Sequence, residues 1–349
     1  MIIFRADGNP TIGLGHVMRD LSIADAFRNF GEQCCFCLAD AGLSELIINR
    51  GHAVKVLGSR FDRMDDELEI IKKEIHVLAN VSAVFIDSYY VTENYLSSMH
   101  SFCQSRGIIL VYVDDVLSFP YSCDVLINYN IYASFEQYRT LYHKLNKPVF
   151  LLGTAYAPLR TEFQQLQDRV IRIVGRDVLI STGGSDSTHV GIELIRTIIE
   201  TPEWSDIRFH FILGILNEDY CEIEELAKGS MNIQIHENVS QMAELMKSCD
   251  VAITAAGSTM YELCATQTPS ITYILADNQI PGANGFEKSG VLHTAGDIRI
   301  IGMKKLARSV LCQAIDLLNN YNERNRIAKI MRQIVDGKGA NRIVNLILK

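Results

Sequence analysis

Short apolar runs alternate along the chain with longer stretches in which apolar residues return every three or four positions. The short runs are typical of buried strands, and the longer stretches are typical of helices with one apolar face. Regular strand–helix alternation predicts a parallel sheet that is covered by helices on both faces. In the first half, the pattern predicts strands at 2–5, 33–38, 53–57, 83–87, 108–113, 125–128 and 149–152. It predicts helices at 16–30, 43–50, 65–79 and 93–105.

The alternation breaks at a polar turn over 153–160 and then starts again. The charged stretch after this turn predicts a helix over 161–172. The second series predicts strands at 178–181, 208–213, 232–236, 251–254 and 270–275. It predicts helices at 190–200, 220–227, 242–248, 259–265 and 305–318, and tail helices at 322–335 and 340–348. We therefore expect two doubly wound, Rossmann-like α/β domains that face each other across a cleft, 1–160 and 161–349, with a linker near 156–172.

The composition narrows the class of partner. Of the 349 residues, 48% are hydrophobic and 21% are charged, so the chain can bury two full cores. The formal net charge of −8, together with the lack of a basic run, argues against nucleic acid as a partner. An acidic small molecule must therefore be held locally, by helix N-termini and a few basic side chains.

The sequence also bears on location and metals. No stretch approaches the roughly 18 uninterrupted apolar residues that predict a membrane span, and the first strand contains charged residues, unlike a signal peptide. The nine cysteines form no C-x-x-C pair, which fits reduced thiols in the cytosol. A metal at Cys34, Cys35 and Cys37 is not expected, because in a strand Cys35 points away from the other two. We expect a cytoplasmic protein with no membrane insertion, metal or cofactor, and of undetermined oligomeric state.

The first strand leads into a glycine-containing turn and a helix that opens with a histidine, His16. Ligands of open α/β sheets bind outside the carboxyl ends of the strands. A turn at this place aims backbone N–H groups and the histidine at the same small space. The candidate binding residues around His16 in this corner are Arg5, Asp7, Gly13, Gly15 and Arg19.

His16 is a candidate general base. The positive end of the helix and the nearby Arg19, three residues on, both disfavour a protonated imidazole. We therefore expect His16 to be neutral near pH 7 and able to accept a proton. The alternative is a histidine that caps the helix or packs in the core.

Two turns in the second half have the same strand–turn–helix form. Gly183, Gly184 and Ser185 follow one strand, and Gly257, Ser258 and Thr259 follow another. Small residues allow a ligand to approach the backbone, and a hydroxyl at the helix N-terminus binds a phosphate oxygen. Glu262, one turn further on, is placed to accept hydrogen bonds from a ribose diol. The alternative is a pair of tight turns with a helix-capping serine and a solvated glutamate.

Polar residues follow three further strands. Asn278 and Gln279 end one strand of the second half and can hold sugar hydroxyls, although they also suit a simple turn. In the first half, Asp87 or Tyr89 can reach the cleft. The adjacent Asp114 and Asp115 are interpreted as a structural turn, because neighbouring residues at a strand end point in opposite directions.

Taken in order, these motifs resemble the PseG/SpsG family, the UDP-sugar hydrolases of pseudaminic acid biosynthesis, within the GT-B glycosyltransferase-like superfamily. The opening motif, from Arg5 to Arg19, is specific to that family, whereas the glycine and Ser/Glu motifs are shared with the wider superfamily. The matching segments span nearly the whole chain: 5–7 and 12–19, 86–89, 152–163, 182–186, 256–262 and 278–279. The stretch 280–285 departs from the family pattern and is rich in glycine.

The resemblance implies a GT-B architecture and a UDP-sugar substrate, UDP-2,4-diacetamido-2,4,6-trideoxy-β-L-altropyranose. The implied products are UDP and the free sugar, formed by inverting attack of a water molecule that His16 activates. Tyr89 and Asn278 match supporting active-site residues of the family. The second domain would hold UDP, with Glu262 on the ribose and the turns at 183–185 and 257–259 near the diphosphate.

Three other functions remain compatible with the sequence. A GT-B glycosyltransferase would use His16 to deprotonate an acceptor hydroxyl instead of water, and a UDP-sugar 2-epimerase would release an epimerised sugar. A non-catalytic sugar-nucleotide binder of a surface-glycan pathway would bind UDP without turnover. Because one fold supports all of these chemistries, the release of UDP without an acceptor is what separates the hydrolase from the transferase.

Overall fold

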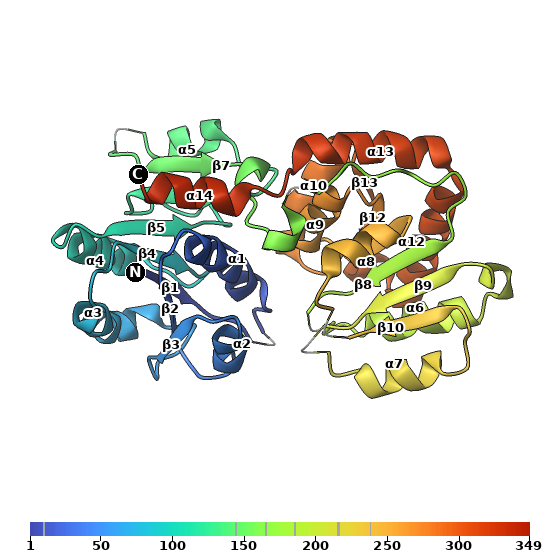
Figure 1. The fold of residues 1–349 in the computed structure, drawn as a ribbon, viewed down its shortest axis with the longest axis horizontal. Helices are drawn as coiled ribbons and strands as arrows, with labels where there is room; N and C mark the ends of the chain where they lie inside the picture. Colours follow the sequence, from blue (N-terminus) through green and yellow to red (C-terminus); the bar gives the residue numbers. More distant parts are fainter. Residues whose placement is uncertain (10, 144, 165, 185, 215–216, 238) are drawn as a thin grey trace. The chain divides into compact units, whose positions relative to one another are not determined.

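The computed structural model describes residues 1–349 except 10, 144, 165, 185, 215–216 and 238. Contacts between Cα atoms divide the chain into two compact units. Unit 1 comprises residues 1–161 and 337–349, and unit 2 comprises residues 162–336. Each unit is built around one parallel sheet, so the chain is α/β throughout (Figure 1).

The sheet of unit 1 has seven parallel strands in the order β3-β2-β1-β4-β5-β6-β7. Every residue of β1 and of β4 is buried, as expected for strands that are covered on both faces. The order reverses between β1 and β4, which places the topological switch point of this sheet at their carboxyl ends. The strands are β1 (Ile2–Ala6), β2 (Cys34–Leu38), β3 (Ala53–Val56), β4 (Ala83–Asp87), β5 (Ile109–Val113), β6 (Val125–Asn128) and β7 (Val149–Leu152).

Helices cover both faces of this sheet (Figure 1). One face packs on α1 (Gly15–Asn29), α2 (Ser44–Asn49) and α14 (Gly339–Ile347). The other face packs on α3 (Leu68–Val77), α4 (Glu93–Gln104) and α5 (Phe135–Leu141). Two short 3-10 turns complete the unit, η1 (Met64–Glu67) and η2 (Thr154–Tyr156), and a third, η3 (Thr161–Phe163), lies where the chain passes from unit 1 into unit 2.

The sheet of unit 2 repeats the same plan with six parallel strands in the order β10-β9-β8-β11-β12-β13. The order reverses between β8 and β11, so the turns after these two strands lie at the switch point of the second sheet. The strands are β8 (Asp177–Ser181), β9 (Arg208–Ile212), β10 (Ile233–His236), β11 (Val251–Ala255), β12 (Ser270–Ile274) and β13 (Leu292–Asp297).

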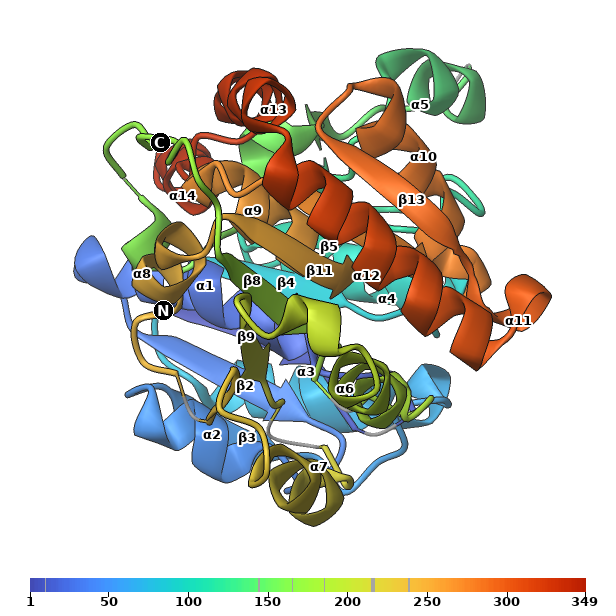
Figure 2. The same ribbon diagram turned by 90° about the vertical axis from the view of Figure 1, so that its right-hand side faces the viewer.

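The helices of unit 2 form two packed groups. The first group is α6 (Val190–Ile199), α7 (Tyr220–Ala227) and α12 (Met303–Asn319), and Figure 2 shows α12 running along the sheet. The second group is α8 (Met242–Ser248), α9 (Thr259–Thr266) and α10 (Ile280–Lys288). The helix α13 (Tyr321–Ile334) packs on α9 and α12. Three short elements remain: η4 (Pro202–Trp204), η5 (Asp277–Gln279) and α11 (Ile298–Ile301).

The helix expected over 161–172 is wrong. Of the residues described between 161 and 172, only those of the turn η3 form a helical element, and the others lie in unit 2 without helix or strand. Arg169 explains this, because its guanidinium donates to the carbonyls of Met246 and Cys249. Its backbone N–H donates to the side chain of Gln267. These long-range hydrogen bonds take the place of the bonds within a helix.

The tail also differs from the expected division of the chain. The sequence places all residues after 160 in the second domain, whereas residues 337–349 belong to unit 1. Their helix, α14, packs on α1, and Ile343 and Val344 join the apolar core beneath it. The apolar periodicity of the tail predicts a buried helical face but not which sheet that face covers.

Candidate active site

The turn between β1 and α1 is shaped by one asparagine and one glycine. The side chain of Asn9 accepts hydrogen bonds from the backbone N–H groups of Thr11 (2.9 Å) and Ile12 (3.1 Å). The backbone of Asn9 also pairs with that of Gly13, which adopts a positive φ of 74°. Glycine takes up this conformation without steric cost. The turn therefore starts α1 at Gly15 and puts His16 in its first turn.

His16 is held by a carboxylate on the neighbouring strand. It lies after β1 and Asp87 ends β4, so the two meet at the switch point of the sheet. The distance between Nδ1 of His16 and Oδ1 of Asp87 is 2.6 Å. Because a carboxylate only accepts, Nδ1 carries the proton in this pair and Nε2 is the nitrogen that can accept one. Only 4% of His16 is exposed, so the ring is fixed by its surroundings.

Tyr89 packs edge-on against the ring of His16, with a centroid separation of 4.4 Å. Tyr89 is 40% exposed, so one part of it contacts His16 and another part contacts solvent. Partial burial and the nearby negative charge of Asp115 raise the pKa of Tyr89 above its usual range. Its phenol therefore stays protonated near neutral pH and can donate a hydrogen bond.

Arg19 locks Asp87 in place. Its Nε donates to Oδ2 of Asp87 and its Nη2 donates to Oδ1, both at 2.5 Å. Burial alone would raise the pKa of Asp87, but the charges of Arg19 and His16 outweigh burial and hold it below its usual range. Asp87 is thus ionised at all ordinary pH values, as a carboxylate that orients a base must be.

The remaining donor of Arg19 contacts two further residues. Its Nη1 lies 2.8 Å from Oδ2 of Asp115 and donates to the hydroxyl of Tyr129 at 3.1 Å. The sequence proposes Arg19 as a residue that binds an anion. In the structure its side chain is almost fully buried, and its guanidinium is bonded to these partners instead. The sequence correctly brings Arg19 beside His16, but its observed contacts are internal.

The residues Asp114 and Asp115 point in opposite directions, as neighbours at a strand end should. Asp114 accepts hydrogen bonds from the hydroxyls of Tyr121 and Tyr138 and so has a structural role. Asp115 instead contacts Arg19, a site role that the sequence analysis missed. Its position directly after a central strand, next to the switch point, is the signal that could have indicated this role.

Arg5 and Asp7 make their contacts with groups other than His16. Arg5 is fully buried, and its guanidinium binds both carboxylate oxygens of Glu67, at 2.5 and 2.8 Å. Its third contact is Oδ2 of Asp7, while Oδ1 of Asp7 accepts from the backbone N–H of Ala39 at 2.8 Å. The flanking residues of β1 belong to the core under α1, so Arg5 points to the opposite face of the sheet. Both side chains are thus bonded within unit 1, and their expected part in ligand binding stays a prediction.

In unit 2, the glycine turn after β8 lies beside another loop. Gly183 has a positive φ of 97°, and the carbonyls of Gly183 and Gly184 are packed against Gly214, where any side chain would clash. Ser185 lies outside the described residues. Asp186 accepts from the backbone N–H groups of Val190 and Gly191 and so fixes the start of α6.

The turn after β11 places Gly257, Ser258 and Thr259 at the N-terminus of α9, with Ser258 exposed. The hydroxyl of Ser258 does not cap the helix. Glu262 lies one turn further on and is partly buried. The two glycine turns therefore lie at the switch point of this sheet, which is where ligands of open α/β sheets bind.

The end of β12 carries the last of the candidate residues. Asn278 is exposed in η5, and the side chain of Gln279 accepts from the backbone N–H of Leu275 at 2.8 Å. The altered stretch 280–285 forms the first turns of α10, with a proline at its start. Gln279 therefore shapes the loop, while Asn278 faces solvent.

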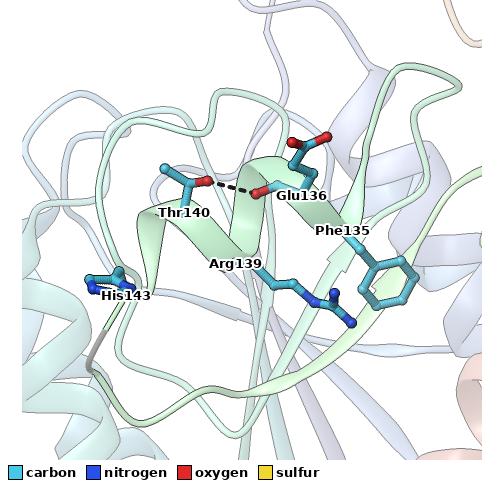
Figure 3. A pocket seen from close by; sticks show the side chains of 5 residues that line it. All are labelled: Phe135, Glu136, Arg139, Thr140 and His143. Atoms are coloured by element: carbon cyan, nitrogen blue, oxygen red, sulfur yellow. Dashed lines mark hydrogen bonds between the residues drawn. The ribbon is translucent and has the colours of Figure 1, made fainter.

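Other features of the described residues bear on the choice of site. No group of three or more histidine, cysteine, aspartate or glutamate side chains among them could hold a metal ion. The searched helices include none that is long and apolar enough to cross a membrane. A depression of about 610 Å³ lies along α5, between Phe135, Arg139 and His143, as Figure 3 shows. None of the candidate residues lines it.

Comparison with known proteins supports the same reading of the fold. Residues 178–333 match the model of the glycosyltransferase family 28 C-terminal domain. Over 343 residues the chain is 22% identical to the spore coat polysaccharide biosynthesis protein SpsG of Bacillus subtilis, covering 98% of this chain and 96% of that one. It is 26% identical over 291 residues to the UDP-2,4-diacetamido-2,4,6-trideoxy-beta-L-altropyranose hydrolase of Campylobacter jejuni, covering 83% and 97%.

The chain is thus similar to the relatives that define the PseG/SpsG family, and its second half matches a glycosyltransferase family model. An uncharacterised protein of Methanocaldococcus jannaschii is also similar, at 27% identity over 285 residues. That match covers 78% of this chain but only 55% of the archaeal protein, so the chain spans about half the length of that relative.

Solved structures agree on the architecture of this chain. Acinetobacter baumannii MurG aligns over 99% of both chains, with a TM-score of 0.64 and 14% identity. The glycotransferase of kitacinnamycin aligns over 99% of this chain and 98% of its own, with a TM-score of 0.66 and 13% identity. At these identities the likeness shows the GT-B fold alone.

Proposed function

We propose that this protein is a UDP-sugar hydrolase in which His16 is the general base. The observation that carries the proposal is the pairing of His16 Nδ1 with Asp87, which leaves Nε2 as the proton-accepting nitrogen at a sheet switch point. The family relationship supports the reaction class, because relatives that align along most of the chain include a named UDP-sugar hydrolase.

The proposed reaction is an inverting displacement by water. Nε2 of His16 takes a proton from water while the water oxygen forms a bond to the anomeric carbon of the sugar. The bond from that carbon to the β-phosphate oxygen breaks, and UDP leaves with the electron pair. The proton on His16 then passes to solvent. Asp87, ionised and held by Arg19, stabilises the imidazolium that forms.

We propose that unit 2 binds the UDP part of the substrate. The turns at Gly183 and Gly257 precede α6 and α9, whose positive N-terminal ends favour a diphosphate and its developing charge. Glu262 is proposed to accept hydrogen bonds from the ribose hydroxyls, and Ser258 and Thr259 to bind phosphate oxygens. Tyr89 and Asn278 are proposed to support the sugar, as the family likeness implies.

The proposed substrate is UDP-2,4-diacetamido-2,4,6-trideoxy-β-L-altropyranose, and the proposed products are UDP and the free sugar, used in making pseudaminic acid. The substrate name comes from the Campylobacter relative, which is 26% identical. Recognition of acetamido groups depends on a few well-placed polar side chains, so relatives at this identity can prefer different sugars.

The decisive experiment follows proton and phosphorus NMR spectra of the protein with this UDP-sugar and no acceptor. We expect UDP and the free sugar of inverted configuration. His16→Gln should lower kcat by roughly 10²–10⁴-fold, the usual scale for loss of a general base. His100→Gln is the matched control, because His100 also pairs with a carboxylate, Asp124, but lies on α4. Equal turnover in the wild type and His16→Gln would refute the role of His16.

The glycosyltransferase remains the second candidate, favoured by the fold of the solved neighbours. It predicts that UDP appears only when an acceptor alcohol is added. Release of UDP in the absence of any acceptor, at the same rate with and without added alcohols, would exclude it.

A further inference from the structure

Asp20 is an unexplained acid beside the proposed base. It lies on α1 four residues after His16, one helical turn on and on the same side of the helix. The residue has no exposed surface, and neither carboxyl oxygen has a hydrogen-bond partner among the described residues. Buried polar groups are nearly always paired, so an acid with two unpaired oxygens calls for a reason.

The surroundings of Asp20 favour its neutral form. An ionised carboxylate without donors is too costly to bury, so such a group keeps its proton instead. Burial raises the pKa of Asp20 well above its usual range, and the negative charge of Asp87 raises it further. Arg19 acts in the opposite direction but is already bonded to Asp87.

The other charged groups nearby are committed elsewhere. On α14, which packs on α1, Arg342 donates to the carbonyl of Ala155. Further along α1, Asp25 pairs with Arg50 and His52. On β1, the only basic side chain points to the other face of the sheet. Arg19 is therefore the cation that an ionised Asp20 would attract.

The proton on Asp20 decides the net charge of the buried groups around Arg19. Arg19 carries one positive charge, and its two partners, Asp87 and Asp115, carry one negative charge each. With Asp20 neutral, the group has a net charge of −1, which becomes zero when His16 takes up a proton. Ionisation of Asp20 adds a second uncompensated negative charge inside the protein.

We propose that Asp20 is a positioning residue that acts on His16 through Arg19 and Asp87. As a neutral acid it leaves the guanidinium of Arg19 to Asp87, which holds His16 in its base form. As a carboxylate it competes with Asp87 for Arg19 and repels Asp87, so the support of His16 is lost. This inference rests on the proposed hydrolase for its kinetic test, but its structural part does not.

The proposal assigns the two limbs of the pH profile. A general base acts only when it is unprotonated, so the proposed mechanism predicts an acid limb of kcat/KM. The alkaline limb belongs to Asp20, whose loss of a proton switches the site off. Tyr89 is not the source of the alkaline limb. Its pKa is raised above the usual tyrosine value, which is already alkaline, so its phenol keeps its proton where Asp20 loses one. Wild-type kcat/KM should fall by about tenfold per pH unit on this limb, as for a single ionisation.

The test compares the wild type with Asp20→Asn, which has nearly the same shape but cannot ionise. We expect Asp20→Asn to keep the acid limb and to lose the alkaline limb, with kcat/KM at neutral pH within about threefold of wild type, a change of under 1 kcal/mol. Asp25→Asn, a change of another carboxylate on the same helix, should keep both limbs. Identical alkaline limbs in the wild type and Asp20→Asn would overturn the proposal.

A second readout needs no substrate. In protein labelled with ¹⁵N-histidine, the His16 resonance should show a second inflection at alkaline pH that Asp20→Asn lacks. Carbon-13 labelling of aspartate should show one carboxyl that stays protonated above pH 7 in the wild type and is absent from Asp20→Asn. If all aspartates are ionised at pH 7, the proposal fails even where hydrolysis is confirmed. If both signals appear but no UDP is released, the hydrolase proposal fails while the coupling of Asp20 to His16 stands.

Discussion

One hydrogen bond decides which nitrogen of His16 can act. Asp87 accepts a hydrogen bond from Nδ1, which keeps its proton, and Arg19 holds Asp87 in the orientation that this bond requires. The same side chain of Arg19 that looks like an anion binder in the sequence is fully used inside the protein. At the scale of single residues, the site is therefore a chain of four groups, from His16 through Asp87 and Arg19 to Asp115.

Asp87→Asn should lower kcat by roughly 10²–10⁴-fold and change KM much less, because an amide can donate to Nδ1 and so select the wrong tautomer of His16. Steady-state release of UDP measures both constants. Asp124→Asn, which alters the carboxylate of the second His–Asp pair, is the control and should leave both constants unchanged. A kcat for Asp87→Asn close to that of the wild type would show that Asp87 does not orient the base.

Asp20→Asn should also make the protein more stable at neutral pH. The folded state keeps the Asp20 proton to higher pH than the unfolded chain does, because the pKa of Asp20 is raised on folding. The folded state then binds more protons, so stability falls as pH rises above the ordinary carboxyl pKa of about 4. The gain in the variant should disappear near that pH. Urea unfolding midpoints across pH measure it, and parallel curves for both proteins would contradict it.

At the scale of elements, apolar patterning predicts nearly all the central strands. The predicted strands at 83–87 and 125–128 coincide with β4 and β6, because buried parallel strands are continuous apolar runs. The predicted strand at 149–152 coincides with the edge strand β7, which is only half buried. The sequence misses β13, whose partly exposed residues include Thr294, Ala295 and Gly296, and the helix α10, which contains two glycines and a proline. Local propensity opposes both elements, and packing against the sheet decides them.

The candidate site, like the fold, is predicted from the sequence only in part. The position of His16 follows from the strand–turn–helix pattern, and the opposite directions of Asp114 and Asp115 follow from strand alternation. The bond between His16 and Asp87 could not be derived, since it joins residues 71 positions apart. The ion pairs of Arg5 likewise depend on Glu67, which comes from a short 3-10 turn that apolar periodicity does not place.

Glu67→Gln tests how strongly η1 is tied to β1. Glu67 is fully buried and accepts from the buried Arg5 twice, from the buried Tyr95 and from the partly exposed Ser59. Removing its charge leaves Arg5 buried with one carboxylate fewer, at a cost of about 3–5 kcal/mol. Hydrogen exchange of β1 should become faster.

Two internal comparisons accompany this change. The fluorescence of Trp204, the single tryptophan, reports unit 2 and should unfold at the same urea concentration as in the wild type. Asp62→Asn, which breaks an exposed pair with Arg60, should leave β1 unaffected. Unaltered exchange of β1 in Glu67→Gln would mean that the pair adds nothing to the stability of this strand.

At the scale of the whole molecule, the two sheets repeat one topology, but the chain does not divide into two consecutive halves. It leaves unit 1 after residue 161 and returns at residue 337, so unit 2 is inserted into unit 1. Two residues further on, Gly339 lies against the backbone of Tyr156 and Ala157. A close approach of this kind permits only glycine.

Gly339→Ala should loosen α14 from unit 1, because the added methyl group overlaps the backbone of Ala157. Overpacking of this kind costs about 1–3 kcal/mol. Hydrogen exchange should increase in α14 and in the face of α1 beneath it, but not in the strands of unit 2. Gly229→Ala is the control, since a methyl group there meets open space. If α14 is as protected from hydrogen exchange in Gly339→Ala as in the wild type, the contact of residue 339 with Ala157 has room for a methyl group.

The return of the chain also sets an order of events during synthesis. A ribosome releases α1, with the proposed base, before it makes unit 2, yet the helix that covers α1 is made only after all of unit 2. Until then, the apolar side chains that later meet Ile343 and Val344 have no cover. A nascent chain that stalls before residue 337 therefore has all strands of its N-terminal sheet but lacks the helix that covers α1, however well its second sheet has folded.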